Sequence, residues 1–242
     1  MNTQDLYNLF RSQVKDDITP FLWSDPEVYD YMNDAHFMFC RLVRGIADST
    51  TPTDTNGLPL TLIPVNANDI FEPISPLILK IREAQRDYDN NTLTILNFED
   101  ITSGHYLATP QQDTDYGFVN RPYKLDSVPG VTSAIIEGME QEKIRLLPPS
   151  DRGFNIELII YRLPLETITA AAAPQNFEID VQHHRHLLLW MKYLAYSKED
   201  AETFNKSKAL ENKALFEEYC DRAKLEKDTR EAKYRQIAYG GL

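Results

Sequence analysis

Residues 190–202, with the sequence WMKYLAYSKEDAE, combine the end of a buried helix, a break and a new helix start. One apolar helix stripe is predicted by residues at three- and four-residue spacing, namely Leu187, Trp190, Met191, Leu194 and Ala195. Beyond them, Ser197 and Asp200 have the spacing of a capping box, in which Ser197 accepts a backbone N–H of a second helix and Asp200 reaches back. The stretch therefore predicts two helices joined by a tight corner, which is a scaffold element rather than a reaction centre.

A second capping box opens a long helix nearer the N-terminus. Ser24 is followed three positions later by Glu27, and Pro26 occupies an early helical position where its missing N–H is harmless. The predicted core stripe of this helix consists of Val28, Tyr31, Met32, Ala35, Met38, Phe39, Leu42, Val43 and Ile46. A shorter amphipathic helix precedes it and ends before Pro20; its apolar residues are Leu6, Leu9, Phe10 and Val14. We expect the longer helix to be the central helix of the core.

The middle of the chain changes from helical to extended patterns. A polar loop at 48–58 leads into extended segments at 60–64, 76–81 and 92–96, and a turn at 89–91 predicts that the last two form a hairpin. A short helical piece at 98–103 and a long exposed loop at 109–129 follow. Three further extended segments are predicted at 131–137, 142–147 and 154–161. Together these segments predict a small antiparallel sheet or sandwich inserted between helices.

The predicted fold class is therefore α+β, with a mainly helical body, an inserted small antiparallel β-sheet or sandwich, and an extended C-terminal tail. We expect residues 1–57 to form an N-terminal helical part and 58–169 the inserted β-rich region. Residues 170–227 are predicted to form a C-terminal helical part that packs on the first, with its last helix running from about Lys198 to beyond Lys227.

Residues 228–242 are predicted to form a tail of different character. It has apolar or aromatic side chains at short intervals, namely Tyr234, Ile237 and Tyr239, with Arg235 among them. Gly240 and Gly241 give the last residues a wide range of backbone conformations. Aromatic anchors without an evident core partner are typical of a docking peptide. A frayed helix end is the other interpretation, and the sequence leaves both open.

Composition excludes several classes of function. The chain of 242 residues has 37 acidic and 25 basic residues and a formal net charge of -12, which argues against a surface that grips nucleic-acid phosphates. The N-terminal residues lack the pattern of a signal peptide, and no apolar run is long enough to span a bilayer, so we expect no membrane association. Cys40 and Cys220, far apart in sequence, are expected to be buried reduced thiols.

The sequence contains no recognisable catalytic pattern. Glycine is scarce, nine in the chain, and no GxxxxGK, GxGxxG or GxSxG sequence occurs, which disfavours the common ATPases and hydrolases. His183, His184 and His186 form the one cluster with metal-binding potential, but no Cys or HExxH pattern supplies a further ligand. Polar residues at a helix start explain them better. We therefore predict no catalytic residue, no metal and no cofactor.

The order of several short motifs resembles the head-to-tail adaptor (connector, or head completion) proteins of tailed bacteriophages. These motifs are LWSD at 22–25, LLPP at 146–149, YRLP at 161–164, LW at 189–190 and AYSKEDAE at 195–202, and they cover nearly the whole chain. The residues that carry the resemblance are Trp23, Ser24, Asp25, Trp190, Tyr196, Ser197 and Asp200. The chain departs from the pattern in its histidine-rich run at 183–186 and in its Asp-rich loop at 111–116.

The resemblance implies a structural virion protein without enzymatic activity, assembled in the host cytoplasm and located in the neck between head and tail. Adaptors of this kind form a ring, commonly a dodecamer of identical copies, beneath the portal protein, and they contact tail or nozzle proteins on the other side. The resemblance also implies that the tail with Tyr234, Arg235, Ile237 and Tyr239 binds the portal. DNA would pass through the ring without specific binding. A monomeric interaction module and an enzyme with a dispersed carboxylate or histidine site are the alternatives.

Overall fold

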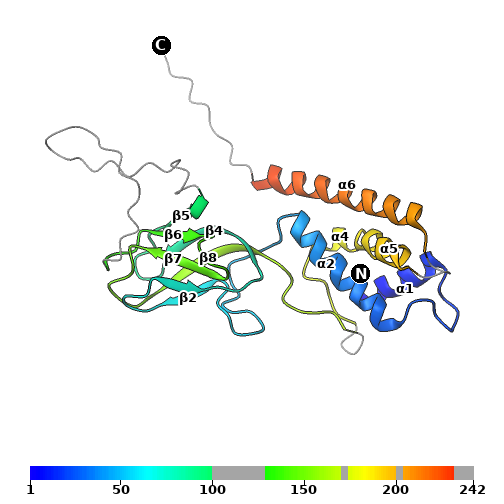
Figure 1. The fold of residues 1–242 in the computed structure, drawn as a ribbon, viewed down its shortest axis with the longest axis horizontal. Coiled ribbons are helices and arrows are strands. Elements are labelled where there is room, and N and C mark those ends of the chain that lie inside the picture. The colour runs from blue at the N-terminus through cyan, green and yellow to red at the C-terminus, as the bar shows by residue number, and fades with distance from the viewer. Residues whose placement is uncertain (100–128, 170–173, 200–203, 232–242) are drawn as a thin grey trace, which may run out of the picture. The chain divides into compact units, whose positions relative to one another are not determined.

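The computed structural model describes residues 1–99, 129–169, 174–199 and 204–231. The chain divides into two compact units, Met1–Ile46 with Glu166–Leu242 and Ala47–Leu165 (Figure 1). The first unit contains helices and the second contains two small sheets, so the fold class is α+β as predicted.

The helical unit is built from α1 (Thr3–Val14), α2 (Asp25–Leu42), α4 (Val181–His184), α5 (Leu187–Ser197) and α6 (Lys206–Glu231) (Figure 1). The predicted start of α2 is confirmed, because the Glu27 carboxylate accepts the backbone N–H of Ser24 at 3.4 Å and a proline stands in the first turn. The N-terminus of α1 has the same device, since the side chain of Asn2 accepts the N–H of Asp5 at 2.8 Å and Asp5 reaches back.

The core of this unit is centred on α5 rather than on α2. Helix α5 packs against α1, α2 and α6. Its sequence, LLLWMKYLAYS, is apolar nearly all round, so it can bury more than one face. Helix α2 buries one side only; its buried residues are Val28, Tyr29, Met32, Ala35, His36, Phe39 and Cys40. The free thiols of Cys40 and Cys220 are both buried in this unit, as predicted.

The predicted helix start at Lys198 is wrong. Ser197 is the last residue of α5, and its hydroxyl donates to the carbonyl of Tyr193 one turn back at 2.7 Å, so it does not cap the next helix. Helix α6 begins at Lys206, where the side chain of Asn205 accepts the N–H of Lys208 at 3.0 Å. Asp200, the other half of the predicted capping box, lies outside the described residues.

The second unit contains two four-stranded sheets. In the first, β8 (Phe154–Arg162) pairs with β1 (Ile46–Asp48), β2 (Leu62–Val65) and β4 (Ile78–Arg86). In the second, the order is β3 (Phe71–Pro73), β7 (Lys143–Leu147), β6 (Ala134–Glu137) and β5 (Thr94–Asn97). One cluster of buried side chains takes members from both sheets, including Ile63, Ile81, Ile144, Leu146, Ile156 and Ile160. The sheets therefore share a core, and the alternation of more and less buried residues over the first part of β8 shows that one face of this strand contributes to it.

Three details of the predicted β region differ from the structure. The predicted hairpin is present only next to the turn at 89–91, where Gln85 and Thr92 form an antiparallel bridge and the N–H of Leu93 donates to the carbonyl of Ala84 at 2.8 Å; β4 and β5 themselves belong to different sheets. The sheet is not wholly antiparallel, because β5 and β6 pair in parallel. Ile46, predicted as the end of the long helix, starts β1, since Arg44 and Gly45 adopt left-handed conformations that end α2. The predicted loop at 109–129 lies outside the described residues, apart from residue 129.

No helix among the described residues combines the length and hydropathy needed to cross a membrane.

Candidate interaction surfaces

Arg11 is the centre of the corner that holds the motif LWSD at 22–25. Its guanidinium pairs with the buried carboxylate of Asp16, donates to the carbonyl of Trp23 at 2.7 Å and reaches Asp25 at 2.7 Å. Asp16 in turn accepts the backbone N–H groups of Leu22 and Trp23, at 2.8 and 3.3 Å. The side chains of Arg11 and Asp16 are only 5% and 2% exposed, so this pair fixes the turn between α1 and α2 from within.

The structure brings the two motif segments of the helical unit together. The indole of Trp23 lies edge-on to the ring of Tyr196, with 6.5 Å between ring centroids, and Lys198 pairs with Glu27 at 2.9 Å. Burial alone would raise the pKa of Glu27, but hydrogen bonds from Lys198 and Tyr31 outweigh it and lower that pKa. These residues form a packed corner rather than an open site.

Trp190 belongs to the same helical core, with its polar edge directed at α2. Its Nε1 donates to the Asp34 carboxylate at 2.6 Å, and its ring packs on Phe216 at 5.1 Å. Trp190 therefore links α5 to both α2 and α6. Sequence patterns identify its apolar character, but they do not identify Asp34 as its partner.

The histidines of the 183–186 run contact two different places: His183 and His186 share Tyr219, and His184 contacts backbone carbonyls. His183 Nδ1 lies 2.8 Å from the hydroxyl of Tyr219, and the ring of His186 stacks on the ring of Tyr219 at 3.5 Å. His184 lies between the carbonyls of Met1 and Ile179, at 2.7 and 2.9 Å. Burial lowers the pKa of His183 and of His186. Over the described residues, no three His, Cys, Asp or Glu side chains gather closely enough to hold a metal ion.

The end of α6 is tied to the end of α2. Lys227 Nζ donates to the carbonyl of Gly45 at 2.6 Å, and Asp228 pairs with Arg44 at 2.8 Å. A cation at the C-terminal end of a helix interacts favourably with its exposed carbonyls. The predicted docking residues Tyr234, Arg235, Ile237 and Tyr239 lie outside the described residues, so the structure fixes only the point from which their segment leaves.

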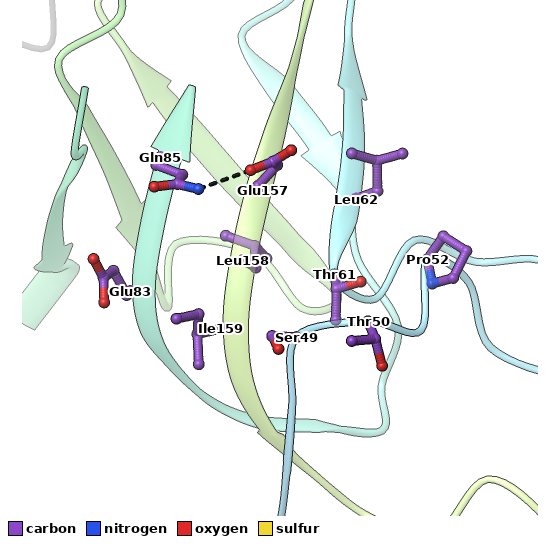
Figure 2. A pocket seen from close by; sticks show the side chains of 10 residues that line it. All are labelled: Ser49, Thr50, Pro52, Thr61, Leu62, Glu83, Gln85, Glu157, Leu158 and Ile159. Carbon is purple, nitrogen blue, oxygen red and sulfur yellow. Dashed lines mark hydrogen bonds between the residues drawn. The ribbon is translucent and has the colours of Figure 1, made fainter. Parts of the chain in front are cut away.

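A groove of about 370 Å³ lies on the β unit (Figure 2). Its lining comes from the loop before β2 and from β2, β4 and β8, and consists of Ser49, Thr50, Pro52, Thr61, Leu62, Glu83, Gln85, Glu157, Leu158 and Ile159. No motif in the sequence indicates this groove, because its residues come from three strands and a loop that lie far apart along the chain.

A buried ion pair holds the loop that borders the groove. Arg162 Nε donates to Asp48 at 2.6 Å, and Asp48 also accepts the N–H groups of Thr50 and Thr51 at 2.9 and 3.1 Å. Burial would raise the pKa of Asp48, but the hydrogen bonds from Thr50 and Arg162 lower it well below its usual range. These bonds hold the start of the loop in one conformation, so the side of the groove that the loop forms has a fixed position.

Comparison with known proteins identifies the class of this chain. Residues 1–238 match the family described as SU10 adaptor protein. The chain therefore belongs to this family, which is a family of phage head-tail adaptors. No curated protein matches the chain. An adaptor is a structural protein, so membership favours a non-enzymatic role and a place in the virion neck.

Proposed function

We propose that this chain is one subunit of a ring beneath the portal protein, and that the ring joins the DNA-filled head to the tail. The match over residues 1–238 to an adaptor family carries this proposal, because it spans both compact units rather than a single common domain. Neighbouring copies in a closed ring meet through two different faces, and twelve copies is the number that the resemblance implies.

The segment after α6 is the proposed portal-binding element, with Tyr234, Arg235, Ile237 and Tyr239 as its contacts. The contacts of Lys227 and Asp228 with the end of α2 support this role, since they anchor the base of the segment. A tethered peptide with aromatic anchors loses less entropy on binding when its base is already fixed. In this proposal, the helical parts at 1–57 and 170–227 carry the C-terminal portal-binding segment. The β-rich part at 58–169 contacts the tail or nozzle proteins of the phage.

Removal of residues 232–242 tests the docking role. The predicted boundary at residue 228 would cut into α6, which extends to Glu231, so the shorter deletion keeps the helix and both of its anchoring contacts. We expect an unchanged unfolding temperature and loss of binding to purified portal rings in sedimentation or pull-down assays. The pair Tyr234→Ala and Tyr239→Ala should reproduce the loss. A truncated protein that binds portal rings as well as the full chain would refute the proposal.

The net charge of -12 supports a passive channel for DNA. A negatively charged lining repels phosphates, so a duplex can move through without being held. Light scattering after chromatography, with and without portal rings, tests the ring itself: we expect assembly of adaptor copies on the portal.

A further inference from the structure

The groove on the β unit carries two carboxylates with different surroundings. Glu157 is oriented by Gln85, whose Nε2 donates to its Oε2 at 2.7 Å (Figure 2). Glu83 has no hydrogen-bond or ion-pair partner among the described residues. The register places Gln85 opposite Glu157, and Glu83 opposite Ile159, so all four side chains lie on one face of the sheet.

Apolar side chains border these carboxylates and are left uncovered. Leu62 is opposite Glu157 on the other side of β8 and is 39% exposed, and Ile159 is half-buried on the same face. Pro52 adds a further apolar surface from the loop. The groove thus offers a hydrophobic strip next to negative charge.

The lining includes neither lysine nor arginine. The unit that carries it, Ala47–Leu165, has 17 acidic and nine basic residues, and therefore contributes -8 of the chain's net charge of -12. Glu83 on β4 and Glu157 on β8 are diagonal neighbours, about 7 Å apart across the two strands, and the neutral Gln85 lies directly opposite Glu157. At that spacing, the cationic end of one long side chain can lie close to both carboxylates.

We propose that this groove binds an extended segment of a tail or nozzle protein, with a lysine or arginine whose aliphatic part lies on Ile159 and Leu62. The cationic end then interacts with Glu157, already oriented by Gln85, and with Glu83. The identity of the partner as a tail protein rests on the proposed adaptor function. The chemistry of the occupant, an apolar stem with a positive charge, rests on the lining of the groove.

The test uses full-length variants assembled on portal-bearing heads and measures the binding of the purified tail or nozzle protein. We expect Glu157→Gln and Glu83→Gln each to weaken binding about 3- to 10-fold, and Glu157→Lys to weaken it more than 10-fold through direct repulsion. Ile159→Thr, which keeps the branching suited to a strand, should weaken it about 3-fold. The effect of the two Glu→Gln changes should shrink as salt is raised, because it is electrostatic.

Glu140→Gln is the matched control. Glu140 is an exposed carboxylate of the same unit that lies outside the groove and pairs with Lys143 at 2.7 Å, and its removal should leave binding unchanged. Equal binding of wild-type protein and Glu157→Lys would overturn the inference, as would equal losses in Glu140→Gln and Glu157→Gln.

Binding of the same variants to portal rings separates this inference from the proposed function. Groove variants that keep portal binding and lose tail binding support both. Variants that keep both interactions contradict the groove as a docking site and leave the adaptor role intact. A full chain that binds neither portal nor tail contradicts the adaptor role itself.

Discussion

The two units of this chain place their charges differently. In the helical unit, the buried Arg11 pairs with the buried Asp16, and the exposed carboxylate of Asp34 accepts a hydrogen bond from the indole of Trp190. In the β unit, Asp48 and Arg162 are matched in the same way. Glu83 and Glu157, however, remain on an open groove, and Glu72 is buried without an ionic partner in the described part of the chain. The helical unit therefore uses polar residues to fix geometry, whereas the β unit also keeps negative charge available for contact.

Removal of Arg11 tests the first half of this comparison and has the largest expected effect. Arg11→Met should lower the free energy of unfolding by about 3–5 kcal/mol, because it leaves Asp16 buried and unpaired. Arg41→Met, at an exposed position of α2, should change it by less than about 0.5 kcal/mol. Urea unfolding followed by circular dichroism measures both. A loss below about 1 kcal/mol for Arg11→Met would show that the corner does not depend on the matched pair.

Glu72 tests the second half. It is 5% exposed, its Oε1 has no hydrogen-bond partner within the described residues, and burial together with the nearby charge of Asp69 raises its pKa to about 7. A carboxyl with a raised pKa favours folding while it is protonated, so its contribution should fall as pH rises from about 4.5 through 7. Glu72→Gln should therefore be more stable than wild type at pH 8, by about 3 kcal/mol, and nearly equal at pH 4.5.

Thermal unfolding at both pH values measures this difference. Glu142→Gln, an exposed carboxylate in the same unit, serves as the control and should show no pH-dependent gain. A Glu72→Gln protein that is less stable than wild type at pH 8 would mean that the carboxylate has a stabilising partner.

The anchor between α6 and α2 has the smallest expected effect. Lys227→Met removes the bond to the Gly45 carbonyl and should cost about 0.5–1.5 kcal/mol, and it should speed hydrogen exchange in the last turn of α6. Lys224→Met, on the exposed side of the same helix, is the control. Unchanged protection in Lys227→Met would mean that the Arg44–Asp228 pair and packing hold this end without the lysine.

Local signals in the sequence predicted most helices and strands. Capping chemistry located the start of α2, because Ser24, Pro26 and Glu27 act within one turn. The same rule predicted the wrong start for α6. The hydroxyl of Ser197 donates to a carbonyl in the preceding turn instead, and Asn205 is the residue whose side chain caps α6. The pairing of β4 with β8 could not be predicted, because turn chemistry at 89–91 defines a reversal of the chain and says nothing about which distant strand pairs with β4.

The candidate sites were less predictable than the fold. The motif residues Trp23 and Tyr196 meet in the structure, but Arg11, which holds the motif in place, lies on the helix before it and carries no signal of its role. No sequence pattern marks the groove residues either, because each occupies an ordinary outward-facing position of a strand or loop. Such constellations depend on strand register and loop path, which become visible only once the chain is folded.

The bond from Lys227 to Gly45 also bears on mechanical load in an adaptor. Gly45 lies two residues before the chain enters the β unit at Ala47. Tension on the C-terminal segment would thus reach the connection to the β unit across the side-chain contacts of Lys227 and Asp228, by a route that bypasses the interior of the helical unit. A pull between head and tail could then be transmitted while the helices stay packed.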